Sequence, residues 1–242
     1  IRESEVAVLD AASKQGYHDG GFKVYDIKDK AAPKLLKHVR TGGFGTHRFD
    51  VDENYAYIST EMPGYQGNIL VIYDITNPSS PQEVSRWWLP GQNTAAGETP
   101  TWPGAYVRLH HALRSGDELW AGCWGGGLAG IDISDIKNPK TFCHYDYHPP
   151  VREVSHTFMR VPFKVAGREI ALAIDEEGSS PYVGQMHAYM WVFDVEDRTN
   201  PKPISTFSME EGDSPYAKMA INSGERFGAH QFREKMTDTL VY

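Results

Sequence analysis

Four of the ten histidines of this sequence lie in short segments of the same design. In each segment a large apolar residue, Phe or Leu, stands two positions after the histidine. The four histidines are His47, His111, His156 and His230. Neutral imidazole is the most common side-chain ligand of transition metals in proteins, and it binds iron, copper, nickel and zinc. Four imidazoles at equivalent positions predict a shared metal site, with Fe or Cu favoured and Zn as a further candidate.

A structural role for these histidines is the alternative. A histidine on a half-buried strand end is often held by a loop carbonyl, and gene duplication would copy such a residue into every repeat. His111 rather than its neighbour His110 fits the pattern, because the apolar residue Leu113 stands two positions after it. The sequence leaves both roles open.

Two glutamates and one tryptophan occupy matching positions just after another set of predicted strands. They are Glu61, Trp124 and Glu176. A metal-bound histidine usually donates its second N–H group to a carboxylate or carbonyl, which orients the ring. Glu61 and Glu176 are therefore candidates for orienting the histidines or for acid/base catalysis. Their alternative role is that of solvated loop carboxylates.

Large apolar and aromatic residues in the longer loops predict a lining for a small aromatic or apolar ligand. The candidates for substrate binding are Trp102, Tyr106, Trp124 and Met186. Each of them has packing between neighbouring sheets as its alternative role.

These segments belong to a repeated frame. Each copy has an apolar strand that ends in Asp, and a Pro stands seven residues after that Asp. The pairs are Asp26 and Pro33, Asp74 and Pro81, Asp132 and Pro139, and Asp194 and Pro201. The aspartates are 48, 58 and 62 residues apart, and a period of this length indicates a repeat architecture. The Asp is expected to set a turn by accepting backbone N–H groups, and the Pro to begin an edge strand.

The frame is clearest in Asn68–Trp88, NILVIYDITNPSSPQEVSRWW, and it resembles the LVIVD repeat, a bacterial and archaeal β-propeller repeat. The resemblance implies an all-β fold, and aligning the copies on the Asp predicts four antiparallel strands per repeat. The strands are expected at Thr46–Val51, Tyr55–Thr60, Leu70–Ile75 and Glu83–Leu89; at Arg108–Leu113, Glu118–Gly122, Leu128–Ile133 and Thr141–Tyr145; and at Glu153–Val161, Glu169–Ile174, Ala188–Val195 and Pro203–Ser208.

We therefore predict one β-propeller domain over residues 1–242, incomplete at both ends, whose complete form has six to eight blades. The complete blades are 42–89, 106–148 and 153–208, and the partial blades are 1–41 and 226–242. In the partial blades, Ser4–Leu9 and Thr239–Tyr242 match second strands and Phe227–Arg233 matches a first strand.

First strands line the central channel of a propeller, so the four histidines are expected to point into that channel. The apolar residues two positions further on are expected to form a collar on the same side. They are Phe49, Leu113, Phe158 and Phe232.

A histidine-lined propeller axis is similar to that of the carotenoid-cleavage oxygenases, where four histidines hold Fe(II). It is also similar to the selenium-binding protein/methanethiol oxidase family, which is associated with copper. These likenesses rest on architecture and residue type, without a shared sequence motif. They imply a metal-dependent enzyme, an oxidoreductase (oxygenase or oxidase) or a lyase, that acts on a small aromatic or apolar molecule. The alternative is a non-catalytic β-propeller that serves as a binding or interaction scaffold.

The composition argues against several classes of partner. A net charge of −8 does not suit a nucleic-acid groove, which needs clustered Lys and Arg. No apolar run approaches the roughly 18 residues of a membrane span. Cys123 and Cys143, the only cysteines, are expected to remain unbonded, because a third strand of the same blade lies between their strands. No targeting segment is recognisable, so the compartment stays open. The oligomeric state stays open as well.

Overall fold

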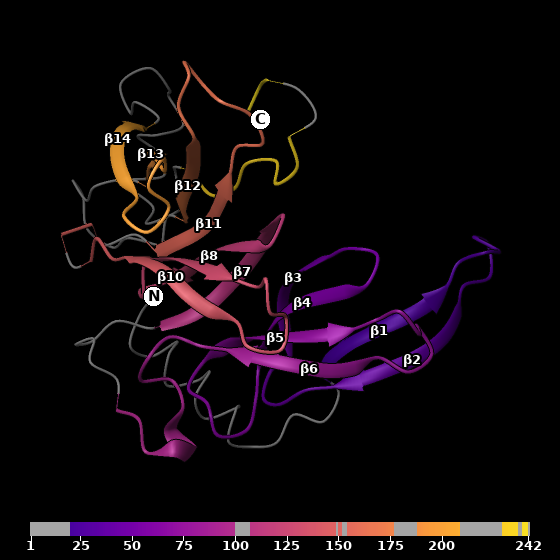
Figure 1. The fold of residues 1–242 in the computed structure, drawn as a ribbon. Helices are drawn as coiled ribbons and strands as arrows, with labels where there is room; N and C mark the ends of the chain where they lie inside the picture. Colours follow the sequence, from indigo (N-terminus) through magenta and orange to yellow (C-terminus); the bar gives the residue numbers. More distant parts are fainter. Residues whose placement is uncertain are drawn as a thin grey trace, which may run out of the picture. The chain divides into compact units, whose positions relative to one another are not determined.

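The structure is a computed structural model that describes residues 20–99, 107–148, 150–151, 154–176, 188–208, 229–236 and 239–241. These residues contain fourteen β-strands and one short 3-10 helix, Thr94–Ala96 (Figure 1). The predicted all-β class is therefore confirmed. Within the same residues no helix is long and apolar enough to cross a membrane.

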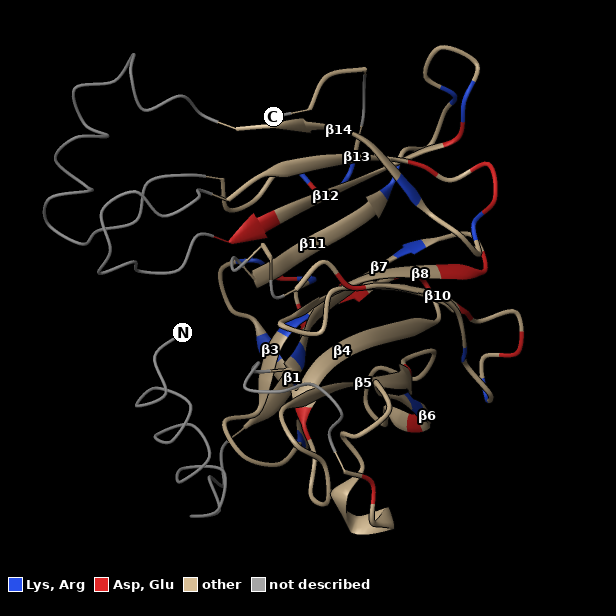
Figure 2. Cartoon of the chain, turned by 90° about the vertical axis from the view of Figure 1, so that its left-hand side faces the viewer, with Lys and Arg blue, Asp and Glu red and all other residues tan. Residues whose placement is uncertain are grey.

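The chain divides into two compact units. The N-terminal unit comprises Arg2–Ala112 and Ile133–Lys140, and the C-terminal unit comprises Leu113–Asp132 and Thr141–Tyr242. In the C-terminal unit charged residues lie mainly in loops and at strand ends, whereas several strands of the N-terminal unit also carry charges along their length (Figure 2). The buried apolar residues of the strands form core clusters within each unit.

The N-terminal unit contains a two-stranded sheet, β1 and β2, and a four-stranded antiparallel sheet in the order β3-β4-β5-β6. Its strands are β1 (Gly21–Asp26), β2 (Lys34–Arg40), β3 (Thr46–Val51), β4 (Tyr55–Glu61), β5 (Asn68–Asp74), β6 (Gln82–Trp87) and the first part of β7 (Val107–Ser115). The central strands β4 and β5 are rich in β-branched and aromatic residues and are buried on both faces. Their core residues are Ala56, Ile58, Ile69, Val71 and Tyr73.

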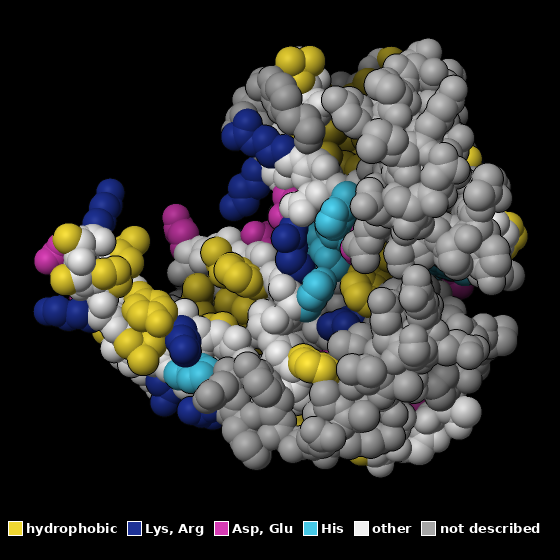
Figure 3. Space-filling view, turned by 180° about the vertical axis from the view of Figure 1, so that it is seen from behind, with side chains coloured by type: hydrophobic (Ala, Val, Ile, Leu, Met, Phe, Trp, Pro, Cys, Tyr) yellow, Lys and Arg dark blue, Asp and Glu magenta, His cyan; other side chains and the backbone are white. Residues whose placement is uncertain are grey.

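The β1–β2 hairpin buries Phe22 and Val39 against that core but exposes apolar residues elsewhere. Tyr25 is 46% exposed, Ile27 60% and Leu35 53%. Figure 3 shows hydrophobic side chains at the surface of this hairpin. A large apolar surface at a sheet edge is typical of an interaction site.

The C-terminal unit is built on a sheet with the strand order β10-β9-β8-β11-β12-β13-β14, and β7 pairs with β8. The strands are β8 (Glu118–Trp124), β9 (Leu128–Asp132), β10 (Lys140–Tyr145), β11 (Val154–Arg160), β12 (Ile170–Glu176), β13 (Met190–Asp194) and β14 (Lys202–Phe207). One residue pair, Ser155 with Trp124, joins β11 to β8, whereas β11 and β12 are paired along most of their length.

Apolar clusters lie on both faces of β11 and β12. On one face Phe158 packs against Trp120 and Phe193, with the Trp120 and Phe158 ring centroids 4.8 Å apart. On the other face Met159 packs with Leu172. Side chains alternate between the faces of a strand, so neighbouring residues of β11 belong to different clusters.

The repeated Asp and Pro residues act as the sequence predicts. The side chains of Asp26, Asp74 and Asp194 each accept a hydrogen bond from the backbone N–H group two residues later, at 2.9–3.0 Å. The strands β2, β6, β10 and β14 each begin at the residue that follows the Pro of the frame. Each of these strands also stands at one end of its sheet order. At such an edge the missing N–H group of proline costs no ladder hydrogen bond.

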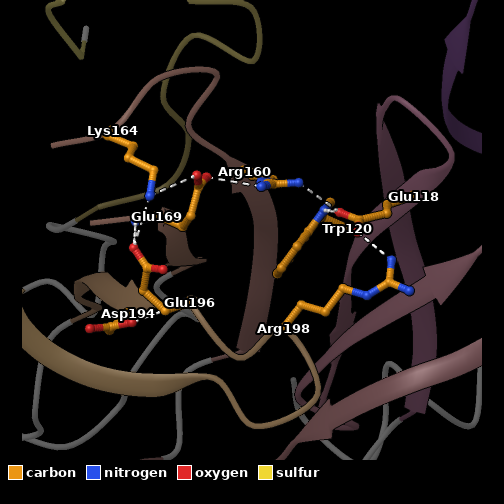
Figure 4. Close-up of polar contacts among 8 residues, drawn as sticks. All are labelled: Glu118, Trp120, Arg160, Lys164, Glu169, Asp194, Glu196 and Arg198. Atoms are coloured by element: carbon orange, nitrogen blue, oxygen red, sulfur yellow. Dashed lines mark hydrogen bonds and ion pairs between the residues drawn. The ribbon is translucent and has the colours of Figure 1, made fainter. Parts of the chain in front are cut away.

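In the C-terminal unit charged side chains link strands at the same end as these turns (Figure 4). The buried carboxylate of Glu118 accepts hydrogen bonds from the guanidinium groups of Arg198 and Arg160 and, at 3.1 Å, from the indole N–H of Trp120. Arg160 also donates to Glu169 at 2.9 Å. Glu118 thus connects the β13–β14 loop, β8 and β11.

The predicted strand at Phe227–Arg233 is wrong for the residues that the structure describes, because residues 229–236 form no strand. The described residues offer this segment no paired strand, and instead Phe232 packs its side chain onto the cluster around Met159. Residues 239–241 also form no strand, and Ser4–Leu9 lies outside the described residues. Cys123 and Cys143 are both free and buried, as predicted.

Candidate functional site

Two of the predicted histidines, His47 in β3 and His156 in β11, lie at β-bulges. In β3, Thr46 pairs with Thr60 and Arg48 with Ser59, so His47 is the extra residue. In β11, Ser155 pairs with Asp175 and Thr157 with Ile174, so His156 is the extra residue. A bulge bends the strand and re-aims the side chain at that position, and bulges are over-represented beside active sites.

In the C-terminal unit two imidazoles and one carboxylate lie together. The rings of His156 and His230 meet edge to face with their centroids 4.7 Å apart. The Nε2 atom of His230 lies 3.7 Å from Oε1 of Glu176, and a ring nitrogen of His156 lies within 4.8 Å of a Glu176 carboxylate oxygen. His156 comes from β11 and Glu176 from the end of β12. Three of the residues predicted from the sequence are therefore neighbours.

The surroundings of His156 suit a metal ligand. The residue is buried, and its Nδ1 atom lies 2.7 Å from the hydroxyl oxygen of Thr157. When Nδ1 carries the proton and donates it to that hydroxyl, Nε2 carries the lone pair with which imidazole binds a metal. His230 is more open, since 58% of its side chain is exposed, whereas the Glu176 side chain is 16% exposed. This donor set, two imidazoles and one carboxylate, fits a first-row transition metal.

The end of β8 closes one side of this group. A Cβ atom on Gly122 would lie 2.4 Å from the carbonyl oxygen of His156, so only glycine allows the two backbones to come this close. Trp124, predicted to contact substrate, pairs with Ser155 next to His156 and has a φ of 49°. A non-glycine residue in this left-handed conformation is strained, and such strain is common at functional sites.

In the N-terminal unit the ring that meets His47 is that of His110, with the centroids 4.7 Å apart. His111 contacts His110, and their Nδ1 atoms are 2.7 Å apart. Apolar spacing favoured His111 over His110, but it is His110 that the structure brings to His47.

The pKa of His47 is lowered to about 4 although the residue is exposed to solvent. Partial loss of hydration is the main cause, and the positive charges of Arg108 and Arg48 and the neighbouring His111 add to it. His47 is therefore neutral at pH 7, in the form that binds metals.

Glu61 has a different environment from Glu176. Its carboxylate accepts a hydrogen bond from the backbone N–H group of Phe44 at 2.9 Å. A Cβ atom on Gly43 would lie 1.5 Å from the same carboxylate, so Glu61 is packed against the turn before β3. The contacts of Glu61 therefore hold this turn, and its predicted catalytic role stays a prediction.

The predicted apolar collar is wrong. Phe49 is 57% exposed. Leu113 and Phe232 share a cluster with Met159, whereas Phe158 lies in the cluster on the other face of β11. The bulge at His156 explains the difference, because an extra residue breaks the simple alternation that places residues two apart on one face. Trp102, Tyr106 and Met186 lie outside the described residues.

A buried polar network, which the spacing of the repeats does not predict, includes the residues directly before His156 and Glu176. Asp175 accepts hydrogen bonds from the hydroxyl of Tyr147, from the indole N–H of Trp191 at 2.8 Å and from the backbone N–H of Tyr189 at 3.2 Å. The hydroxyl of Tyr147 accepts a hydrogen bond from Ser155 at 2.6 Å. Burial raises the pKa of Asp175 to about 6, and it raises that of Tyr147 well above the usual value.

A sequence signal for this network existed. Asp175 ends the apolar run Ile170–Ile174, and an ionisable residue that continues a buried strand requires hydrogen-bonding partners.

The comparison with protein families identifies one repeat. Residues 46–87 match the family model of the LVIVD repeat. The matched segment contains β3, β4, β5 and β6, so the four-stranded sheet of the N-terminal unit is an LVIVD repeat, as the sequence predicts. Among curated proteins, no sequence matches the chain.

Proposed function

We propose that the protein is a metal-dependent enzyme, an oxidoreductase or a lyase, that acts on a small aromatic or apolar molecule. Two contacts in the C-terminal unit carry the proposal: the rings of His156 and His230 meet edge to face, and His230 lies beside the Glu176 carboxylate. Two imidazoles and one carboxylate are the donor set of the non-haem iron oxygenases, so iron is favoured, with copper next and zinc as a further candidate. The bound metal would supply activation of O2 or Lewis-acid polarisation of a substrate oxygen.

The roles of the protein's own residues follow from their positions. His156 is the buried ligand, oriented through Thr157, and His230 is the more exposed ligand. Glu176 supplies the negative charge that offsets part of the charge of a divalent ion. Trp124 forms a wall on which an aromatic substrate packs. That His47 and His111 bind the same metal ion stays a prediction.

For the fold, we propose a β-propeller of four-stranded antiparallel blades, with six to eight blades in the complete form. Support comes from the LVIVD repeat, whose match spans one whole four-stranded antiparallel sheet. The strands β11-β12-β13-β14 repeat this order in the C-terminal unit. The shared Asp turn and the shared start of the fourth strand after Pro make the two sets equivalent.

Metal analysis of the protein purified without chelators tests the proposed function. We expect one equivalent of iron or copper per chain and a loss of most of it in His156→Ala and His230→Ala. His38→Ala is the matched control, because His38 lies in β2 opposite Lys23 and outside the repeated histidine positions, and it should keep the full metal content. Wild-type protein without bound metal, even after incubation with Fe(II), Cu(II) and Zn(II), would contradict the proposal.

A non-catalytic binding scaffold is the second candidate. The exposed apolar residues of the β1–β2 hairpin favour it, because such a surface suits contact with another protein surface. In this case the histidines are structural residues copied with the repeat. A folded protein that binds no metal, and whose fold is unchanged by His230→Ala, would favour the scaffold.

A further inference from the structure

We propose that the buried network of Ser155, Tyr147, Asp175 and Trp191 is a clamp that positions His156 and Glu176. This inference rests on the proposed function, because it assigns positioning residues to the same group of ligands. Tyr147 is its central member, since its hydroxyl connects Ser155 on β11 to Asp175 on β12.

The location of the clamp is the first argument. Ser155 and Asp175 are paired across β11 and β12. Ser155 directly precedes His156, and Asp175 directly precedes Glu176. The clamp therefore fixes the backbone at the positions directly before the two ligands.

The bulge is the second argument. His156 is the extra residue of the bulge, so the regular register between β11 and β12 skips it. Hydrogen bonds of the residues on either side of it therefore help to set its orientation. Thr157 contacts the ring at Nδ1, and the clamp fixes the residue before it.

The chemistry of the network is the third argument. Ser155 and Asp175 are fully buried, and Tyr147 is stacked between Trp191 and His148 at centroid distances of 4.9 Å. A buried carboxyl group is costly, and apolar residues of similar volume often stabilise a core as well or better. A polar network with defined hydrogen-bond geometry instead fixes one arrangement of the strands, and precise ligand placement requires this.

The variant Tyr147→Phe tests the clamp, because it removes the hydroxyl and keeps the ring between Trp191 and His148. Supporting residues of metal sites typically change metal affinity by about 10–100-fold, so we expect the Kd for Zn(II) to rise at least tenfold. We also expect the ring nitrogen signals of His156 in 15N NMR to shift in the metal-free protein. Tyr145→Phe is the matched control, since the Tyr145 ring packs on the same core through Phe193, and both readouts should stay at wild-type values.

Ser155→Ala provides a second, milder variant that removes only the arm to β11. Ser155→Ala should move the His156 signals in the same direction as Tyr147→Phe does. If Tyr147→Phe fails to fold, Ser155→Ala alone tests the clamp. Unchanged His156 signals in the folded variants would overturn the clamp whether or not metal binds. Wild-type protein that binds no Zn(II), with His156 signals that do shift in the variants, would refute the metal ligation and leave the clamp as a positioning device for His156.

Discussion

Replacing Gly122 with alanine should destabilise the protein and displace His156 together. The new Cβ atom would lie 2.4 Å from the carbonyl oxygen of His156 and 3.0 Å from that of Ser155. Real Cβ contacts essentially never fall below 3.0 Å, so β8 and β11 must separate by about 0.6 Å, the difference between 3.0 and 2.4 Å. The atoms in contact belong to the backbone, so no side-chain rotation relieves the clash.

Overpacking of this kind costs about 1–3 kcal/mol. For a chain of this size each 1 kcal/mol lowers the Tm by about 2–4 °C, so the Tm should fall by about 2–12 °C. Thermal unfolding followed by circular dichroism measures this change, and 15N NMR of the His156 ring measures the displacement.

Gly116→Ala is the control, because a Cβ atom there meets nothing within 4 Å and its φ of +62° is the only source of strain. That strain costs about 1–2 kcal/mol, so the Tm should also fall, but the His156 signals should not move. If Gly122→Ala lowered the Tm while leaving the His156 signals at their wild-type positions, the close approach of β8 to His156 would be refuted.

Three further predictions concern charge, thiols and pH. Glu118→Gln weakens the hydrogen bonds from Arg198 and Arg160, so the free energy of unfolding in urea should fall by about 1.5–3 kcal/mol. The control Glu83→Gln, in an exposed pair with Arg86, should change that free energy by less than about 1 kcal/mol. Equal effects of the two variants would contradict the role of the Glu118 network. Burial raises the pKa of the Cys143 thiol to about 12 and that of Cys123 still further, so neither thiol should react with dithionitrobenzoate until denaturant is added, and reaction of the native protein would count against their burial. The pKa of His47 is about 4 in the folded protein, whereas the ordinary value of histidine, 6.5, applies to the unfolded chain. The unfolded chain therefore takes up the proton first as the pH falls. The free energy of unfolding should therefore decrease from pH 6.5 to pH 4, and His47→Asn should reduce this slope, whereas an unchanged slope would show that His47 is not held neutral.

The repeated frame of the fold follows from local rules, and for that reason the sequence predicts it well. An Asp that accepts a backbone N–H group two residues later needs no long-range information, and a Pro at the start of an edge strand needs little. Strand positions derived from Asp74 and Asp194 agree with the structure within a few residues.

The details of the site depend on features that residue spacing does not encode. The bulges at His47 and His156 insert one extra residue into each strand, so residues two apart no longer share a face. Apolar spacing also favours His111, whereas the ring that meets His47 is that of His110. The same spacing predicted a collar that the structure does not form.

Equivalent positions in the repeat also differ in their neighbours. Glu61 and Glu176 both end a second strand, but the turn at Gly43 and Phe44 captures the carboxylate of Glu61. Glu176 instead lies beside His230. This difference arises from the loop before β3, far from Glu61 in sequence, and only tertiary structure reveals it.

X-ray absorption spectroscopy of the metal-loaded protein tests the central claim most directly, because it counts the imidazole ligands of the bound ion. For wild-type protein we predict at least two imidazole nitrogens, those of His156 and His230, and carboxylate oxygen at about 2.0–2.2 Å from the metal. For His230→Ala, which removes the more exposed ligand, we predict one imidazole fewer. A wild-type spectrum without imidazole scattering, or a His230→Ala spectrum identical to that of the wild type, would contradict metal binding by His156, His230 and Glu176.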